Sequence, residues 1–180
     1  NGNTVATYAP ANVANGNTVT FQPTNPNGTD RHINVYYHTN EIHDFMKLKF
    51  PLFTTMDNAL TARVDRTDGD CNAFYNGTSI NFYTTANGCN ALSYVGDVMY
   101  HEYGHGINDK FWTSQGSSFD NGAMGEGYAD VWAMSIIKNP FIGLGFFVNQ
   151  PNSLIRRYDI NPKIYPQNIV GEVHADGEII

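Results

Sequence analysis

The chain has 180 residues, of which 41% are hydrophobic and only 15% are charged, and its formal net charge at pH 7 is −7. This length suits one domain, or part of one larger unit, with enough residues to bury a core. The acidic balance argues against a nucleic-acid partner, for which a basic patch is expected. The longest apolar stretch, 141–148, is far shorter than the roughly 20 residues that span a bilayer, so no membrane span is expected.

The first part of the chain predicts strands and turns around one helix. Residues 1–30 are rich in Asn, Gly, Thr and Pro, which is typical of short strands and turns. The spacing of apolar residues over 32–49 predicts a helix. Segments 60–64 and 73–83 are expected to be strands, and the second contains the hairpin turn signal Asn76-Gly77.

The second part predicts helices. Asp97 is a candidate N-cap for a helix that runs towards Phe111. A further helix is expected over 123–138, and an irregular segment over 149–168. The chain end, from Val170, is expected to begin another helix.

The two cysteines, Cys71 and Cys89, flank a strand-like segment. The Asn-, Thr- and Gly-rich composition favours a loop-rich extracellular enzyme, and from the start at Asn1 without an initiator Met we expect a processed or excised chain. In a secreted protein the cysteines are expected to form a disulfide; the alternative is two buried free thiols. Their spacing does not suit a Cys-x-x-Cys zinc site.

The most informative motif is His101-Glu102-Tyr103-Gly104-His105, which falls in the helix predicted after Asp97. Positions i and i+4 of a helix lie on one face, so two imidazoles in this spacing can bind one Zn²⁺, with the carboxylate beside its open position. A solvated surface helix is the alternative. The pattern predicts a zinc-dependent peptidase.

A catalytic zinc site needs a third protein ligand. A metzincin would have Gly and His at the positions of Asn108 and Phe111, and the Glu-Gly-Cys motif of peptide deformylases is missing. We therefore expect Glu126, 21 positions after His105, to complete the site from a second helix. Asp130, one turn further along that helix, is expected to orient a liganding imidazole.

These residues resemble the fungalysin family of zinc metallopeptidases and, more distantly, thermolysin. The segments that carry the resemblance are 36–44, 71–75, 96–105, 125–130 and 171–177. The resemblance implies an α+β, thermolysin-like zincin core, in which a β-rich N-terminal part is followed by the zinc helices.

The same resemblance implies further roles. His174 corresponds to the histidine that stabilises the tetrahedral intermediate. Asn72 and Ala73 resemble the edge-strand segment along which substrate lies, and either Arg156 or Arg157 would bind a substrate carbonyl. Of thermolysin's calcium positions only Asp97 has a counterpart, and one carboxylate does not make a Ca²⁺ site.

The family pattern also predicts a division within the single unit 1–180. Residues 1–30 would form a lead-in, 31–112 an N-terminal lobe ending in the zinc helix, and 113–180 the start of a helical lobe. The helical lobe of the family continues beyond the position of Ile180. We therefore expect a fragment, or a second polypeptide that completes the lobe.

We expect a secreted zinc endopeptidase that binds one Zn²⁺ per chain and acts on protein or peptide substrates, with Glu102 as the general base. One alternative is an inactive, protease-like binding module. Another is a gluzincin exopeptidase, although its usual Gly-x-Met-Glu-Asn motif is missing. A structural surface protein would leave Glu126, Asp130 and His174 as coincidences.

Overall fold

Helices are the main regular elements of the computed structural model, which describes residues 14–16 and 30–180. The strands and turns expected over 1–30 fall almost entirely outside the described residues. The helices are α1 (Asp30–Lys49), α2 (Gly96–Ser114), α3 (Gly122–Ile137) and α4 (Val173–Gly177), with a 3₁₀ turn at Leu92–Tyr94. The strands are β1 (Thr61–Arg66), β2 (Ala73–Tyr75), β3 (Ser79–Tyr83), β4 (Phe141–Ile142) and β5 (Arg156–Arg157).

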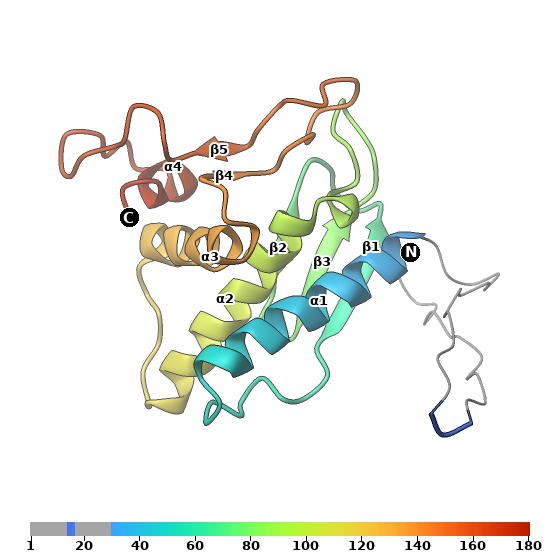
Figure 1. Cartoon of the computed structure of the whole chain (residues 1–180). Coiled ribbons are helices and arrows are strands. Elements are labelled where there is room, and N and C mark those ends of the chain that lie inside the picture. The colour runs from blue at the N-terminus through green and yellow to red at the C-terminus, as the bar shows by residue number, and fades with distance from the viewer. Residues whose placement is uncertain (1–13, 17–29) are drawn as a thin grey trace.

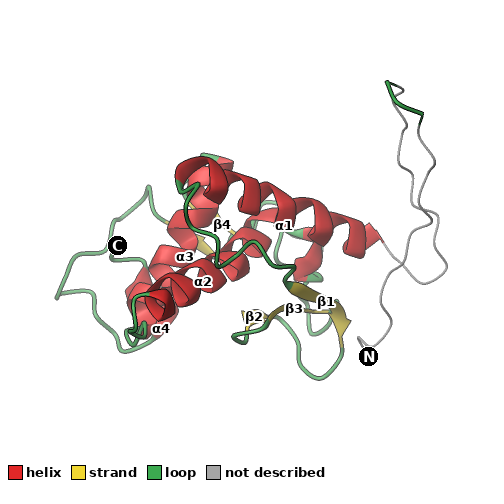
Figure 2. Ribbon diagram, turned by 90° about the horizontal axis from the view of Figure 1, so that it is seen from below, coloured by secondary structure: helices red, strands yellow, loops and turns green. Residues whose placement is uncertain are grey.

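Helix α2 lies at the centre of the molecule, between α1 and α3 (Figure 1). The sheet lies to one side of the helices (Figure 2). Its strand order is β1-β3-β2, with β1 parallel and β2 antiparallel to β3, so β2 is an edge strand. The β2–β3 hairpin confirms the turn expected at Asn76-Gly77. The mixture of helices and small sheets confirms the α+β class.

The hydrophobic core joins the helices to the sheet. It includes Ile42 and Met46 from α1, Phe82 from β3, and Met99 and Tyr103 from α2, all almost completely buried. Burial of each such side chain contributes roughly 1.5–3 kcal/mol. The core therefore fixes the position of α2, which carries the His-Glu-x-x-His motif.

The start of α2 differs from the prediction. Val95 is the N-cap, and Asp97 lies inside the first turn. The Asp97 side chain is buried, and its Oδ2 accepts a hydrogen bond from the backbone N–H of Gly143, at 2.9 Å. The carboxylate thus serves the segment that follows β4, a long-range contact that a local capping pattern does not reveal.

Helix α3 begins and ends close to the predicted positions. The Asn121 side chain caps its start by accepting from the N–H of Met124, at 2.9 Å. Lys138 ends it in the left-handed conformation, directly before Asn139-Pro140. The expected helix at the chain end is the short α4. The irregular stretch 149–168 contains one strand that was not predicted, β5, which pairs with β4.

Cys71 and Cys89 form a disulfide, as expected. Cys71 directly precedes Asn72 and strand β2, and Cys89 forms an isolated β-bridge with Phe147. The disulfide therefore connects the segment just before β2 to the loop after β3. No helix in the described part of the chain is long and apolar enough to cross a membrane. The division into lobes at 31–112 and 113–180 stays a prediction.

Candidate metal centre

Three side chains from two helices converge at one point. His101 and His105 lie one turn apart on α2, with their Nε2 atoms 3.0 Å apart, and Glu126 faces them from α3. Its Oε2 lies 3.1 Å from His101 Nε2, and its Oε1 lies 3.6 Å from His105 Nε2. One ligand atom from each residue falls within 4.8 Å of the others, and no other such group occurs among the described residues.

Small residues allow the two helices to approach. A Cβ at Gly104 would lie 3.2 Å from the Cα of Ala129 and from the Cβ of Trp132, both on α3. A Cβ at Gly127 would lie 2.5 Å from the backbone oxygen of Gly177 in α4. Glycine at these positions therefore brings α3 close to both α2 and α4, despite its cost to helix stability.

The donor set fits zinc. Two imidazoles and one carboxylate are the ligands of a catalytic zinc site with an open position. Oε2 of Glu126 and Oε2 of Glu102 are buried and accept no hydrogen bond within the described residues, although Glu126 Oε2 faces the ring nitrogens of His101 and His174 at 3.1 and 3.4 Å. Buried carboxylate oxygens without partners are costly, and a cation between these side chains would satisfy them.

The electrostatics of Glu126 also suit a ligand. Burial alone would raise the pKa of its carboxyl, but His101 and His105 lower it by more, so the net shift is downward. Glu126 is therefore an anion over the whole working pH range, the form that binds a metal.

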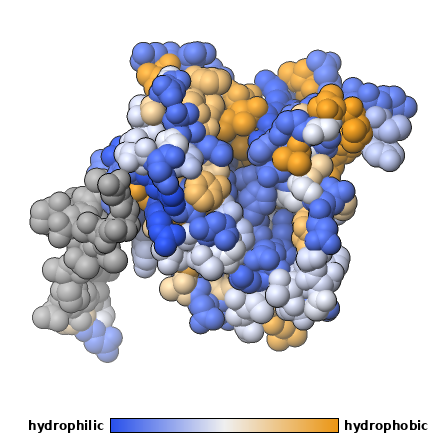
Figure 3. Space-filling view, turned by 180° about the vertical axis from the view of Figure 1, so that it is seen from behind, coloured by the Kyte–Doolittle hydropathy of each residue, from blue (hydrophilic) through white to orange (hydrophobic). Residues whose placement is uncertain are grey.

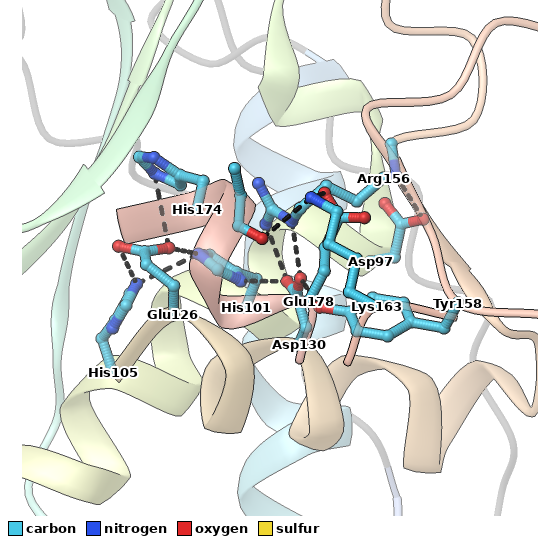
Figure 4. A network of polar contacts seen from close by, with 12 residues as sticks. Asp97, His101, His105, Glu126, Asp130, Arg156, Tyr158, Lys163, His174 and Glu178 are labelled. Carbon is cyan, nitrogen blue, oxygen red and sulfur yellow. Dashed lines mark hydrogen bonds and ion pairs between the residues drawn. The ribbon is translucent and has the colours of Figure 1, made fainter. Parts of the chain in front are cut away.

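Asp130 lies directly behind His101. His101 Nδ1 lies 2.6 Å from Asp130 Oδ1 and can donate to it, which leaves Nε2 pointing at the convergence point (Figure 4). Arg156 donates to both Asp130 oxygens, at 2.6 and 2.7 Å, and the Tyr158 hydroxyl donates to Oδ2 at 2.6 Å. The Asp130 side chain is 1% exposed, and although burial raises the pKa of its carboxyl, His101 and Arg156 lower it by more. This is the arrangement that fixes the orientation of a liganding imidazole.

Glu102, between the two histidines, is 4% exposed and faces the same cleft. Burial raises the pKa of its carboxyl, and the neighbouring His101 and His105 oppose that shift. A carboxylate with a raised pKa accepts a proton more readily than one in water.

His101, Glu102, His105 and Glu126 line a cleft of about 1000 Å³. Viewed from behind, this face is hollowed between two raised parts, and hydrophilic residues predominate in the hollow (Figure 3). His174, on α4, lines the cleft with its Nε2 3.4 Å from Glu126 Oε2. Its Nδ1 lies 2.7 Å from Glu172 Oε1, so the ring is held facing the metal centre.

The structure separates the two arginine candidates. Successive residues of a strand point to opposite sides, so only one of the pair can face the cleft. Arg156 lines it, whereas Arg157 is half-exposed and pairs with Asp159 at 2.6 Å. Arg157 is therefore not brought to the site. Asn72, directly before the edge strand β2, and Ala73, the first residue of that strand, both line the cleft.

Tyr158 was not expected at the site. Its hydroxyl hydrogen bond to Asp130 comes from the side of the chain that also carries Arg156, two positions earlier. The sequence did contain one signal for Tyr158. In an extended segment residues i and i+2 point to the same side, so Tyr158 lies on the same side as Arg156. Without the β4–β5 pairing, nothing in the sequence places this segment beside Asp130.

The chain is similar to a known family, to curated proteins and to a solved structure. Residues 1–109 match the family described as thermolysin metallopeptidase, catalytic domain. Extracellular metalloproteinase 1 of Trichophyton equinum and extracellular metalloproteinase 5 of Arthroderma gypseum are each 28% identical over 116 residues, 54% of this chain. The match covers only 19% and 18% of those proteins.

The fold is similar to that of the precursor of protealysin, a metalloproteinase from Serratia proteamaculans, with a TM-score of 0.54 and 21% identity. That likeness covers 70% of this chain and 44% of the other. Because the family match spans more than half of the sequence and includes His101, Glu102 and His105, the chain belongs to the thermolysin metallopeptidase family.

Proposed function

We propose that this chain is the zinc-binding core of a secreted endopeptidase that hydrolyses internal peptide bonds. The observation that carries the proposal is the convergence of His101, His105 and Glu126 beside the buried Glu102 in one cleft. Family membership supports peptidase chemistry. The disulfide and the names of the extracellular relatives support secretion.

His101, His105 and Glu126 would hold one Zn²⁺, which when bound polarises a carbonyl and lowers the pKa of a water molecule. Glu102 would accept the proton of the attacking water and pass it to the leaving amine. Asp130 would keep His101 in the tautomer that presents Nε2. No calcium role is proposed, since the described carboxylates form no further metal group.

The cleft walls would position the substrate. Edge strand β2, which follows Asn72 and begins at Ala73, pairs with no described strand on its outer side, where an extended peptide would add as a further strand. His174 would donate a hydrogen bond to the developing oxyanion, an interaction worth roughly 3 kcal/mol in comparable sites. Arg156 would bind a substrate carbonyl from the opposite wall while it holds Asp130.

Metal analysis and cleavage of casein test the proposal together. We expect one zinc per chain, and activity that EDTA removes and zinc restores. Glu102→Gln should keep the zinc and lower kcat by about 10²–10⁴-fold, whereas His105→Ala should lose the zinc. Glu102→Gln with wild-type activity would exclude Glu102 as the base, and a zinc-loaded wild type without activity would favour a binding module.

A peptide blocked at both termini separates the two enzyme classes. An endopeptidase cleaves it internally, and an exopeptidase does not. Mass spectrometry of the products gives the position of the cleaved bond. Failure to cleave a blocked peptide, with trimming of the same peptide once its amino terminus is free, would replace the endopeptidase proposal with an exopeptidase.

A further inference from the structure

A row of aromatic side chains leads out of the cleft at the C-terminal end of α2. Phe119 lines the cleft itself. Its ring centroid lies 5.9 Å from that of Trp112 and 6.0 Å from that of Tyr128, and Phe111 lies 5.6 Å from Trp112. We call Phe111, Trp112, Phe119 and Tyr128 the aromatic shelf.

The shelf is not part of the hydrophobic core. Phe111 is 45% exposed, Trp112 37% and Tyr128 42%, and none of the four residues belongs to the core cluster of the described chain. Aromatic side chains gathered at the surface mark interaction sites. Their contact with one another leaves ring faces and edges turned outward, which suits an apolar or aromatic ligand.

The position of the shelf fixes its distance from the metal centre. Trp112 follows His105 by seven residues on α2, and a helix rises about 1.5 Å per residue, so the two lie about 10 Å apart along the axis. An extended peptide advances about 3.3 Å per residue. A peptide that runs parallel to the axis of α2 therefore reaches the shelf about three residues from the bond at the metal.

The immediate surroundings of the shelf favour an apolar ligand. The nearest charges towards the cleft are already paired: Asp109 accepts from the Tyr75 hydroxyl at 2.8 Å and from Lys110 at 3.1 Å. Lys110 also donates to the backbone oxygen of Gly77. Asp109 and Lys110 are thus occupied with one another, and the Asp120 carboxylate beside Phe119 accepts from the Ser118 hydroxyl at 2.6 Å.

We propose that the aromatic shelf binds an apolar or aromatic side chain of the peptide substrate, about three residues from the cleaved bond. This inference rests on the proposed function and names a determinant of its specificity. One aromatic contact corresponds to about a twofold to tenfold preference. Phe119 joins the shelf to the cleft wall, and Trp112 supplies the surface beyond it.

Cleavage of matched peptides tests the proposal. Blocked peptides carry either Phe or Gly at the third position on one side of the scissile bond, and a second pair carries the change on the other side. The wild type should prefer Phe in one pair by about twofold to tenfold in kcat/KM. Trp112→Ala and Phe119→Ala should each bring that ratio to about 1. Because both kcat/KM values come from the same enzyme preparation, their ratio does not depend on the amount of folded protein. Tyr36→Ala, which removes a 71% exposed aromatic from α1, should keep the wild-type ratio.

A binding measurement separates failure of the shelf from failure of the proposed function. In the Glu102→Gln variant, the Phe peptide should change the tryptophan fluorescence and bind more tightly than the Gly peptide, whether or not the wild type cleaves. Trp112→Phe in that background leaves Trp132 as the single tryptophan and should lose most of the signal. Equal binding of the two peptides would overturn the proposal. So would a concentration-dependent dimer that Trp112→Ala dissociates, because the shelf would then be an interface between copies.

Discussion

Arg156 donates to both carboxylate oxygens of Asp130, from a strand that lies 26 positions further along the chain. The Asp130 oxygen that accepts from Arg156 Nη2 also lies 2.6 Å from His101 Nδ1. One buried carboxylate therefore joins α2, α3 and β5. The orientation of the His101 imidazole therefore depends on a contact made far outside its own helix.

Asp130→Asn should weaken zinc binding. The amide removes the charge that holds His101 and leaves the 9% exposed Arg156 guanidinium without its counter-ion. Loss of such a partner typically costs 10–100-fold in metal affinity and about 3–5 kcal/mol in stability. Chelator competition measures the first quantity and denaturant unfolding the second.

Asp159→Asn is the matched control, since Asp159 pairs with Arg157 through similar geometry at the exposed surface. Exposed ion pairs contribute little, so zinc affinity and stability should both stay at the wild-type values. Equal effects of the two variants would mean that Asp130 has no special relation to the metal centre.

Arg156→Lys and Arg157→Lys should differ although both keep the charge. A lysine ammonium cannot reproduce the two parallel N–H bonds that Arg156 makes to Asp130. We expect Arg156→Lys to lower the free energy of unfolding by about 1.5–3 kcal/mol, the loss of one charge-assisted hydrogen bond. Arg157→Lys should change neither stability nor kcat/KM. Substrate cleavage that depends on Arg157 instead would reverse the assignment of the two arginines.

The residues that share a helix face could be predicted from the sequence. The spacing of His101 and His105, and that of Glu126 and Asp130, follow from the helical period, and the structure brings all four side chains together. Their functional roles stay predictions. The contacts that were missed come from β4 and β5, two-residue strands whose pairing leaves no pattern in the sequence. Asp97 looked like a helix cap for the same reason, because its true partner, Gly143, is 46 positions away.

Removal of the disulfide should destabilise the edge of the cleft. Cys71 and Cys89 are separated by 18 positions, and a closed loop of that size contributes about 3 kcal/mol to the free energy of unfolding. Cys71→Ser/Cys89→Ser should lose that amount and should keep one zinc per chain, since neither cysteine lies in the metal group. Reductant should destabilise the wild type equally and leave the double variant unchanged. A double variant as stable as the oxidised wild type would show that the bond constrains nothing.

Asp97 should make stability fall as pH rises. Burial raises the pKa of its carboxyl above the ordinary 3.8, although backbone N–H groups of Gly143 and Val98 oppose the shift. The folded state therefore holds its proton at pH values where the unfolded state has released it. By linkage, the contribution of Asp97 to stability falls from about pH 3.8 up to its raised pKa and levels off above it.

Asp97→Asn cannot titrate, so its stability relative to the wild type should improve across that pH range. A constant offset is also expected, because the new amide N–H₂ takes the place of the buried Oδ1, which has no hydrogen-bond partner among the described residues. An unsatisfied buried donor costs about 1–3 kcal/mol at every pH. The difference in the free energy of unfolding between variant and wild type therefore has two parts. Only the part that changes with pH reports on the carboxyl group. Urea unfolding in steps from pH 4 to pH 8, at equal zinc, measures that part. Parallel curves for Asp97→Asn and the wild type would mean that Asp97 releases its proton as easily in the folded as in the unfolded chain.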